Sequence, residues 1–574
     1  MKLRNFIKYI PALALCLIVF CAGMILYFIL KYGVDIPYMD QWEYVYFFDH
    51  LSKGTLTLGE LFKLQGEYRQ FFPNLIFVSL GWMTNWNVKY EMIVIFILAC
   101  LVSLNIYRLV SFTVIEKPWI KWILFFLANL FIFSPIQYEN WLFGVQIEYF
   151  MPIACVTTAM VIAFSRLDSR LKIVLCLLLG VVSSYSSING PVYWFILFPV
   201  LYFSGSDQGF FKKWHAISIW IMGTAITLFF YFYGYRKPKG FPSTTAVFDN
   251  PLDALKYFFG ILGNPIRIIH SLEHIIYVGG VLVFIFIALI LYVLWHMKDK
   301  QLIRNSVVWI MLGMYSVMTA AMVTVGRLGF GVFQSLTSRY TTYTLYLVVA
   351  TIFLFSIAIL HYAKKKPLFF LQKTGVALLI IYVIYIKADT YPTAVIDLKN
   401  FHASIQHGKA GLLFINYISP EQCTNKIYPS HFDELTRKAN ILNDMGYLRP
   451  SLIKSNIMED IEGDGSGTID YGTFDILFNY TNNYFVASGI AVKPNTNDPA
   501  DAIILTYDNE KGKSQILTIY NDDLKRWSRM IWVGALPYDT LNIKAWAIDA
   551  NTGKAYKLKG SHIIKKTVPK SSQN

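Results

Sequence analysis

The chain has 574 residues, of which 55% are hydrophobic, 17% aromatic and only 15% charged. Soluble globular chains carry about a quarter charged residues, so this composition excludes a soluble enzyme, a disordered protein and a coiled coil. The formal net charge of +15 fits either a nucleic-acid partner or the cytoplasmic loops of a membrane protein. The positions of the Lys and Arg residues decide between the two.

The first element in chain order is an apolar run over residues 10–30, behind a basic start with Lys2, Arg4 and Lys8. A membrane span needs about 20 apolar residues. No small-residue cleavage site follows this run, so we predict an uncleaved span and not a signal peptide. Ten further apolar runs bring the predicted total to about 11 spans: residues 89–113, 119–135, 149–165, 173–187, 191–204, 215–233, 275–296, 305–325, 340–363 and 367–388.

Lys and Arg are concentrated in every second loop between these runs. Cytoplasmic loops carry such an excess, so the basic N-terminus and these loops are predicted to be cytoplasmic, and no nucleic-acid partner is predicted. The apolar segment 71–86 (FFPNLIFVSLGWMTNW) is too short for a span. We predict that it lies in the outer interface with Trp82 and Trp86 as anchors. The protein is therefore predicted to be a multi-pass protein of the cell membrane with an extracytoplasmic C-terminal part.

Three domains are predicted: a transmembrane domain over 1–388, a mixed helical connecting region over 389–460, and an extracytoplasmic β-sandwich over 461–574. The outer loops of the first domain are 32–88, 134–148, 234–274 and 326–339. The sandwich is predicted from short alternating runs separated by turn residues: FDILFNY, YFVASGIAV, DAIILTY, SQILTIY, RMIWVGAL and NIKAWAID. The fold class is thus a mainly α-helical polytopic membrane protein with a C-terminal β-sandwich.

The first two outer loops supply acidic, amide and aromatic side chains. A carboxylate just beyond the first span is placed to take a proton from an incoming hydroxyl, and a solvated acidic loop is the equally compatible alternative. The second loop has no Lys or Arg, and its residue types are typical of sugar contacts but also of ordinary membrane interfaces. The candidates are Asp40, Trp42, Glu43, Glu67 and Arg69 in the first loop, Glu139, Asn140, Trp141 and Gln146 in the second, and Asn189 in the third.

Positive residues also occur in the fourth and fifth outer loops, where the topology rule disfavours them. Arg236 and Lys237 lie in GYRKPKGFP, and Arg327, Arg339 and Tyr340 lie in or beside a Gly-rich loop ending in SRYTTY. A lipid-linked phosphate is the anion that such residues would bind. Alternatively, an arginine at the end of a span only extends its charge to the interface.

Together these motifs resemble the GT-C superfamily of polytopic glycosyltransferases. Asp40 stands in PYMDQWEY after the first span, where that family carries its catalytic acid, and the Phe-Pro interfacial segment and the Ser134–Pro135 motif follow. More narrowly, ENWLFGVQ, NGPVYW and SRYTTY resemble a group of bacterial membrane proteins. Where that group has His-Asn-Glu-His-Arg, this chain keeps Glu67 and Arg69 but neither histidine.

The resemblance implies inverting transfer of a sugar from a polyprenyl-phosphate donor to a cell-surface glycan or cell-wall polymer. Asp40 would be the general base, Glu67 and Glu139 would assist, and the four basic residues would stabilise the leaving phosphate. No cofactor is required by this chemistry, and a divalent ion (Mg²⁺ or Mn²⁺) held by Asp40 and Glu43 remains an alternative. A donor synthase and a flippase would be functional partners. The alternatives from other classes are a polysaccharide polymerase or ligase and a flippase or transporter of lipid-linked sugars.

Overall fold

The structure is a computed structural model that divides by its internal contacts into two units. The first comprises Met1–Gly33, Leu56–Ser79 and Lys89–Leu398, and the second comprises Val34–Thr55, Leu80–Val88 and Lys399–Asn574. The residues described are 2–114, 118–204, 214–236, 240, 242–267, 271–365, 369–418, 421–429, 431–464, 470–481, 484–493, 497–520, 525–532, 536–537 and 540–565.

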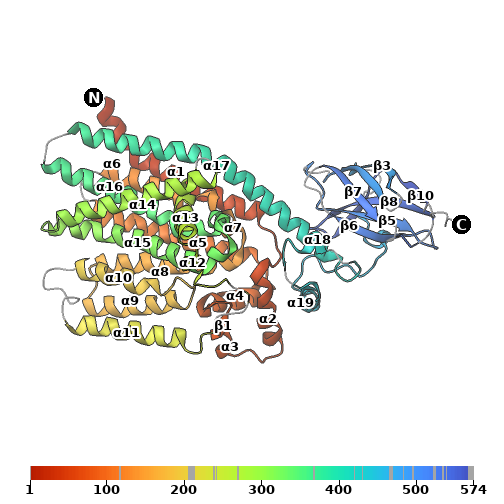
Figure 1. Ribbon diagram of the computed structural model, residues 1–574, viewed down its shortest axis with the longest axis horizontal. Helices are drawn as coiled ribbons and strands as arrows, with labels where there is room; N and C mark the ends of the chain where they lie inside the picture. The colour runs from red at the N-terminus through yellow and green to blue at the C-terminus, as the bar shows by residue number, and fades with distance from the viewer. Residues whose placement is uncertain are drawn as a thin grey trace. The chain divides into compact units, whose positions relative to one another are not determined.

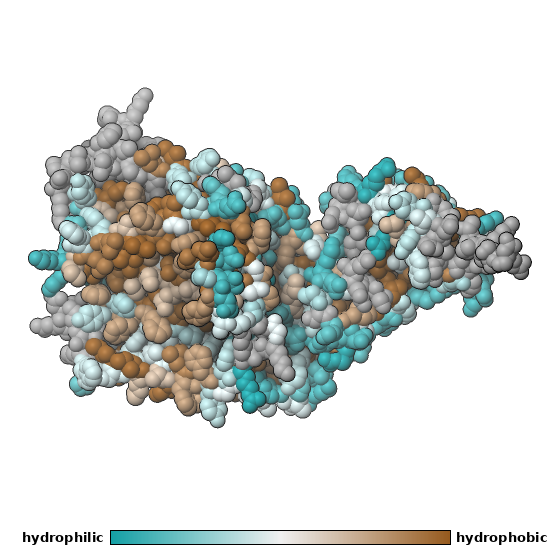
Figure 2. All heavy atoms as spheres, in the orientation of Figure 1, coloured by the Kyte–Doolittle hydropathy of each residue, from teal (hydrophilic) through white to brown (hydrophobic). Residues whose placement is uncertain are grey.

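Helices make up the first unit, and Figure 1 shows most of the long ones running side by side. They are α1 (Lys2–Tyr32), α5 (Lys89–Thr113), α6 (Pro118–Ile132), α8 (Ile147–Phe164), α9 (Ser169–Ser184), α10 (Val192–Ser204), α11 (Trp214–Phe232), α13 (Pro251–Gly263), α14 (Leu272–Trp295), α15 (Lys300–Arg327), α16 (Thr341–Lys365) and α17 (Phe369–Leu413), the last up to Leu398. Figure 2 shows hydrophobic side chains gathered over these helices. This surface is expected for helices whose solvent is lipid.

Among the described residues, eight helices are long and apolar enough to cross a membrane. Their ranges are Lys8–Tyr32, Lys89–Thr113, Pro118–Leu142, Gly144–Phe164, Trp214–Phe232, Leu272–Trp295, Lys300–Phe330 and Ser338–Tyr362. The prediction of a mainly helical chain with several helices able to span a membrane is therefore confirmed, whereas the finer count of about 11 spans stays a prediction. The segment predicted to lie in the interface forms α4 (Phe71–Thr84), which with α10 is shorter than a span.

Packing between helices in the first unit is close and specific. The ring of Trp309 on α15 stacks on Phe353 of α16 with centroids 3.8 Å apart, and its indole N–H donates to Thr113 Oγ1 at 3.1 Å. Helices α13 and α14 meet at Gly263 and Gly279. A Cβ at Gly279 would collide with a carbonyl oxygen of α13, so only glycine allows this approach.

Two antiparallel sheets form the C-terminal part of the second unit. The larger sheet has the order β10-β8-β5-β6, with β9 on β8, and the smaller has the order β3-β4-β7. The strands are β3 (Gly472–Thr481), β4 (Tyr484–Ala491), β5 (Ala502–Asp508), β6 (Ser514–Tyr520), β7 (Arg526–Trp532), β8 (Thr540–Asp549), β9 (Lys554–Lys557) and β10 (His562–Lys565). Five of the six alternating runs lie on β3, β4, β5, β6 and β8, so those strand predictions are confirmed. The run RMIWVGAL overlaps β7 at residues 529–532, and its residues 533–535 lie outside the described residues.

The two sheets enclose a core that contains Phe474, Phe485, Leu505 and Trp527. The other face of the larger sheet packs against the helical region before it, through residues such as Phe414 and Met458. That region contains α18 (Glu421–Thr424) and α19 (Phe432–Asp444). Fully buried and partly buried residues alternate along β4, which is what a sheet with one face in the core requires.

Residues 34–55 and 80–88, which the sequence analysis placed in the transmembrane domain, group by their contacts with residues 399–574. Arg449 forms an ion pair with Asp35 at 2.9 Å, and Asp35 also accepts the backbone N–H of Val88 at 3.1 Å. Phe48 packs on Trp86 with centroids 4.5 Å apart. The second unit therefore uses two early segments, including α2 (Val45–Ser52), as part of its own structure.

Candidate functional site

Three distant segments of the first unit bring charged side chains together. They are the hairpin of β1 (Leu64–Gln65) and β2 (Tyr68–Arg69), the connection from α6 to α8 that contains α7 (Tyr138–Leu142), and the connection from α15 to α16. We call Glu67, Glu139, Glu148, Arg327 and Arg339 the acid–arginine cluster. Glu67, Glu139, Arg327 and Arg339 were candidates from three loops of the sequence, and the structure joins them in two ion pairs. Glu148 was not a candidate and joins the cluster through a hydrogen bond from Tyr68.

Glu67 stands at the turn of the hairpin and pairs with Arg327 at 2.6 Å. The carboxylate side chain is only 7% exposed and the arginine 22%. Gly66, with a φ of 57°, provides the left-handed backbone position that this tight turn requires. A buried charge needs a partner of this kind, so the pair fixes the hairpin to the end of α15.

Glu139 and Arg339 form the second pair, at the longer distance of 3.7 Å. A charge-assisted hydrogen bond is about 2.8 Å, so this pair is loose. Its backbone is nevertheless held firmly, because Asn140 donates to the carbonyl of Arg339 at 2.9 Å and the N–H of Glu139 donates to Ser338 Oγ. Arg339 is 37% exposed and Glu139 22%, so both charges can reach a ligand.

Tyrosines surround the two pairs, and of these only Tyr340 was a candidate from the sequence. Tyr68 donates to the buried carboxylate of Glu148 at 2.7 Å, which ties the hairpin to α8. Tyr149 packs on Tyr343 with centroids 4.6 Å apart, and Tyr149 and Tyr340 are close enough to Arg327 to interact with its charge. Tyr149 in EYF and Tyr340 and Tyr343 in SRYTTY are the sequence signal for this network.

The guanidinium of Arg69 is bound by the backbone of the chain itself, and its predicted role in substrate binding stays a prediction. Its guanidinium donates to three backbone carbonyls: Phe62 at 2.8 Å, Tyr231 at 3.0 Å and Tyr233 at 2.5 Å. The last carbonyls of α11 have no partners within their helix, and an arginine satisfies them well. All three guanidinium nitrogens of Arg69 therefore donate hydrogen bonds within the chain.

Several other predicted contacts lie in the interior. Trp141 has no exposed surface and donates to the Ser134 carbonyl at 2.9 Å, so it offers no ring face to a sugar. Gln146 and Asn189 are each 1% exposed, and Asn189 donates to the hydroxyl of Tyr315 at 2.7 Å. Trp141 and Gln146 lie in the same connection as Glu139, whereas Asn189 contacts α15. The burial of all three gives no support to the substrate contacts predicted for them.

The predicted base, Asp40, belongs to the second unit. It is exposed and lies in a short 3-10 helix, Met39–Tyr44. Its neighbour Trp42 is 0% exposed and packs on Tyr428 with ring centroids 6.5 Å apart, so its burial does not favour the predicted sugar contact, which stays a prediction.

Glu43 is engaged within the second unit. Its carboxylate accepts from Lys438 Nζ at 2.7 Å and from the Tyr428 hydroxyl at 3.2 Å. Burial alone would lower the pKa of Lys438, but hydrogen bonds to Glu43 and Glu434 outweigh it and raise that pKa. Because Glu43 already balances a buried cation, it is a poor partner for Asp40 in holding a divalent ion.

The remaining basic candidates differ from one another. Arg236 is exposed, and Lys237 lies outside the described residues. Tyr340 is 4% exposed, with the Arg339 guanidinium 6.0 Å from the centre of its ring. Within the described part of the chain, no group of three or more His, Cys, Asp or Glu residues is arranged to hold a metal ion.

These features define a helical protein with eight candidate membrane spans among its described residues and a polar site of two glutamate–arginine pairs on its first unit. Arginine forks suit phosphate or carboxylate groups, and a nearby carboxylate suits proton transfer. No protein-family model matches the chain, and no match was found among curated proteins or solved structures.

Proposed function

We propose that the chain is an outer-leaflet glycosyltransferase that moves a sugar from a polyprenyl-phosphate donor to a cell-surface glycan. The observation that carries the proposal is the loose pair of Glu139 and Arg339, 3.7 Å apart, on a rigidly held backbone. Both side chains are partly exposed. They offer one group for an anionic leaving group and one for a hydroxyl proton, as glycosyl transfer from a lipid phosphate requires.

In the proposed reaction the acceptor hydroxyl oxygen attacks the anomeric carbon of the donor. The new carbon–oxygen bond forms as the bond from the anomeric carbon to the phosphate oxygen breaks. The hydroxyl proton passes to a carboxylate, and the electron pair leaves with the lipid phosphate, whose charge Arg339 stabilises. Two carboxylates are candidates for the base: Asp40 in the second unit and Glu139 in the first.

Separate variants test the proposal in a deletion strain complemented with wild type, Asp40→Asn, Glu139→Gln or Arg339→Lys. The measurement is the sugar composition and linkage of the purified cell-surface polymers. We expect the deletion to lose one sugar substituent and Arg339→Lys not to restore it fully, because lysine lacks the planar fork of arginine. Whichever carboxylate is the base, its amide variant should fail to restore the substituent although it is present in the membrane.

Glu273→Gln is the matched control, because Glu273 is an exposed carboxylate at the start of α14, outside the acid–arginine cluster. It should restore the polymer fully. If the deletion leaves every glycan unchanged, the glycosyltransferase proposal is refuted. If polymer length changes while its substituents do not, the polymerase or ligase alternative is favoured, and accumulation of unreacted donor on the inner leaflet would favour a flippase.

A further inference from the structure

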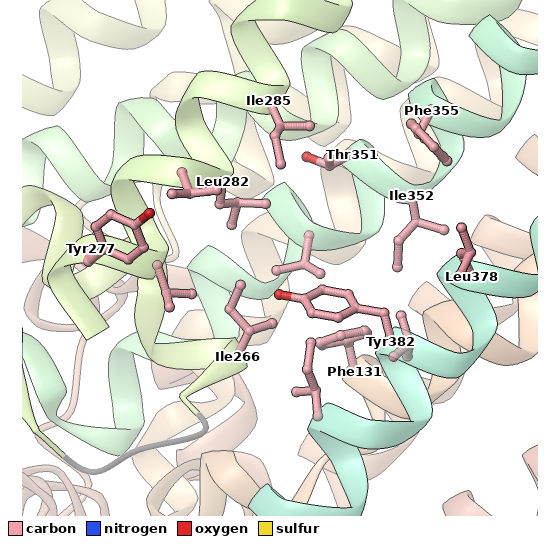
Figure 3. Close-up of a pocket in the computed structure, with 15 residues that line it drawn as sticks. Phe131, Ile266, Tyr277, Leu282, Ile285, Thr351, Ile352, Phe355, Leu378 and Tyr382 are labelled. Carbon is pink, nitrogen blue, oxygen red and sulfur yellow. The ribbon is translucent and has the colours of Figure 1, made fainter. Parts of the chain in front are cut away.

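A second feature of the first unit is an apolar cavity of about 440 Å³ between α14, α16 and α17 (Figure 3). Ligand pockets in proteins have volumes of roughly 300–1,000 Å³, so it has the size of a binding site. Its floor is buried, as at Leu282 and Ile352, whereas its rim is exposed, as at Tyr277 and Leu378. Because α14 and α16 are candidate spans, the exposed rim faces hydrocarbon.

The lining of the cavity offers almost no polar group. Only Tyr277, Thr351 and Tyr382 among its described lining residues carry a hydroxyl. Thr351 already donates to the carbonyl of Leu347 at 2.7 Å. In Figure 3 the Tyr382 hydroxyl points toward Ile266, at the end of the cavity where Phe131 also lies. A hydrocarbon chain fits such a lining, and a sugar does not.

A buried cation lies next to that same end. Val383 and Ile386 line the cavity, and Lys387 follows one helical turn after Val383, so its side chain leaves the same face of α17. Lys387 is 5% exposed, and its ammonium lies 3.7 Å from the centre of the Phe131 ring. Within the described part of the chain, Lys387 Nζ has no hydrogen-bond partner. An ammonium buried in a membrane domain calls for an anionic partner.

Arg267 lies beside the cavity too, directly after the lining residue Ile266. It is 8% exposed, and its charge is balanced by Asp397 at 3.0 Å. Among the described residues no hydrogen-bond partner is left for the Lys387 ammonium at this end, and the single negative charge of a phosphodiester would supply one. Basic pockets between membrane helices bind anionic lipid head groups in this way.

We propose that the cavity holds one acyl chain of an anionic glycerophospholipid, whose phosphate pairs with Lys387. The long, flexible lysine stem lets the ammonium move from the ring of Phe131 to the phosphate. This proposal goes beyond the proposed function and does not depend on it, because the ligand is a resident lipid of the bilayer and not the sugar donor.

The test uses the full chain in detergent, delipidated and titrated with phosphatidylglycerol or phosphatidylcholine, with bound lipid counted by native mass spectrometry. We expect Lys387→Met to weaken phosphatidylglycerol binding about tenfold, the loss of one charged hydrogen bond, and to leave phosphatidylcholine binding unchanged. Lys387→Arg should retain the preference for the anionic lipid. Val281→Trp, which fills the cavity, should weaken binding of both lipids.

Phe284→Trp is the control, because Phe284 is on the same helix but 73% exposed and not part of the lining. The proposal is overturned if Lys387→Met binds phosphatidylglycerol as wild type does, or if Val281→Trp and Phe284→Trp behave alike. It is also overturned if the lipid that copurifies is a polyprenyl phosphate. If Lys387→Met does not fold, the comparison of Val281→Trp with Phe284→Trp decides. The polymer analysis above is a separate readout, so failure of either proposal is distinguishable from failure of the other.

Discussion

Arg327→Met is expected to destabilise the protein strongly, because it removes the cation that faces the buried carboxylate of Glu67 at 2.6 Å. Breaking a buried ion pair on one side costs about 3–5 kcal/mol, since the remaining charge stays buried without its partner. Arg327 keeps 22% of its side-chain surface exposed, so water relieves part of this penalty and we expect about 3 kcal/mol. The double variant Glu67→Gln/Arg327→Met should recover much of the loss, because it leaves no buried charge.

The assay is a double-mutant cycle on denaturant unfolding in one detergent, followed by tryptophan fluorescence. We expect an interaction free energy of about 1–3 kcal/mol between Glu67 and Arg327. Lys256→Met at the exposed Lys256–Asp253 pair is the control, with an effect below about 1 kcal/mol. The reasoning is refuted if Arg327→Met is as stable as the control variant, or if the double variant is no more stable than Arg327→Met.

Three further predictions concern single contacts. Arg69→Met should lower the unfolding temperature more than Arg69→Lys, because lysine keeps a charge for at least one of the three carbonyls; equal shifts would argue against their role. Gly190→Ala should destabilise by more than about 1 kcal/mol, because a Cβ there would collide with the Ser183 carbonyl; an unchanged denaturation midpoint would contradict this. The hydrogen bond from Lys438 lowers the pKa of Glu434. The stability that this pair adds to the fold is therefore complete above the ordinary Glu pKa and is lost as the pH falls through the lowered pKa. Unfolding temperatures measured from about pH 6 to about pH 3 should fall in wild type because of this loss, and should fall less in Lys438→Met.

The regular elements could be predicted because their signal is local. An apolar run of about 20 residues predicts a helix surrounded by lipid. An alternation of apolar and polar residues predicts a strand with one face buried and the other in water. The run RMIWVGAL shows the limit, because the strand itself is Arg526–Trp532 and its start is shifted by three residues. Strand ends depend on pairing with β4, which a single segment does not encode.

The burial of the candidate residues was the main property of the site that could not be predicted from the sequence. Trp42 and Trp141 stand among polar residues, as surface aromatics do, yet both have no exposed surface. Arg69 and Glu43 follow the residue types of a binding loop, but their partners are backbone carbonyls and a lysine almost 400 positions away. Such contacts depend on the tertiary fold, and no local pattern reports them.

The two glutamate–arginine pairs of the acid–arginine cluster have the same chemistry but different geometry, and this argues for different roles. Glu67 and Arg327 are close and mostly buried, so a ligand would have to displace a strong, desolvated contact to reach them. Glu139 and Arg339 are separated by 3.7 Å and partly exposed. A phosphate could therefore accept hydrogen bonds from the Arg339 guanidinium without breaking a strong contact to Glu139. Substitution of Arg339 is therefore expected to abolish sugar transfer without lowering the stability of the fold, whereas substitution of Arg327 is expected to lower the stability first.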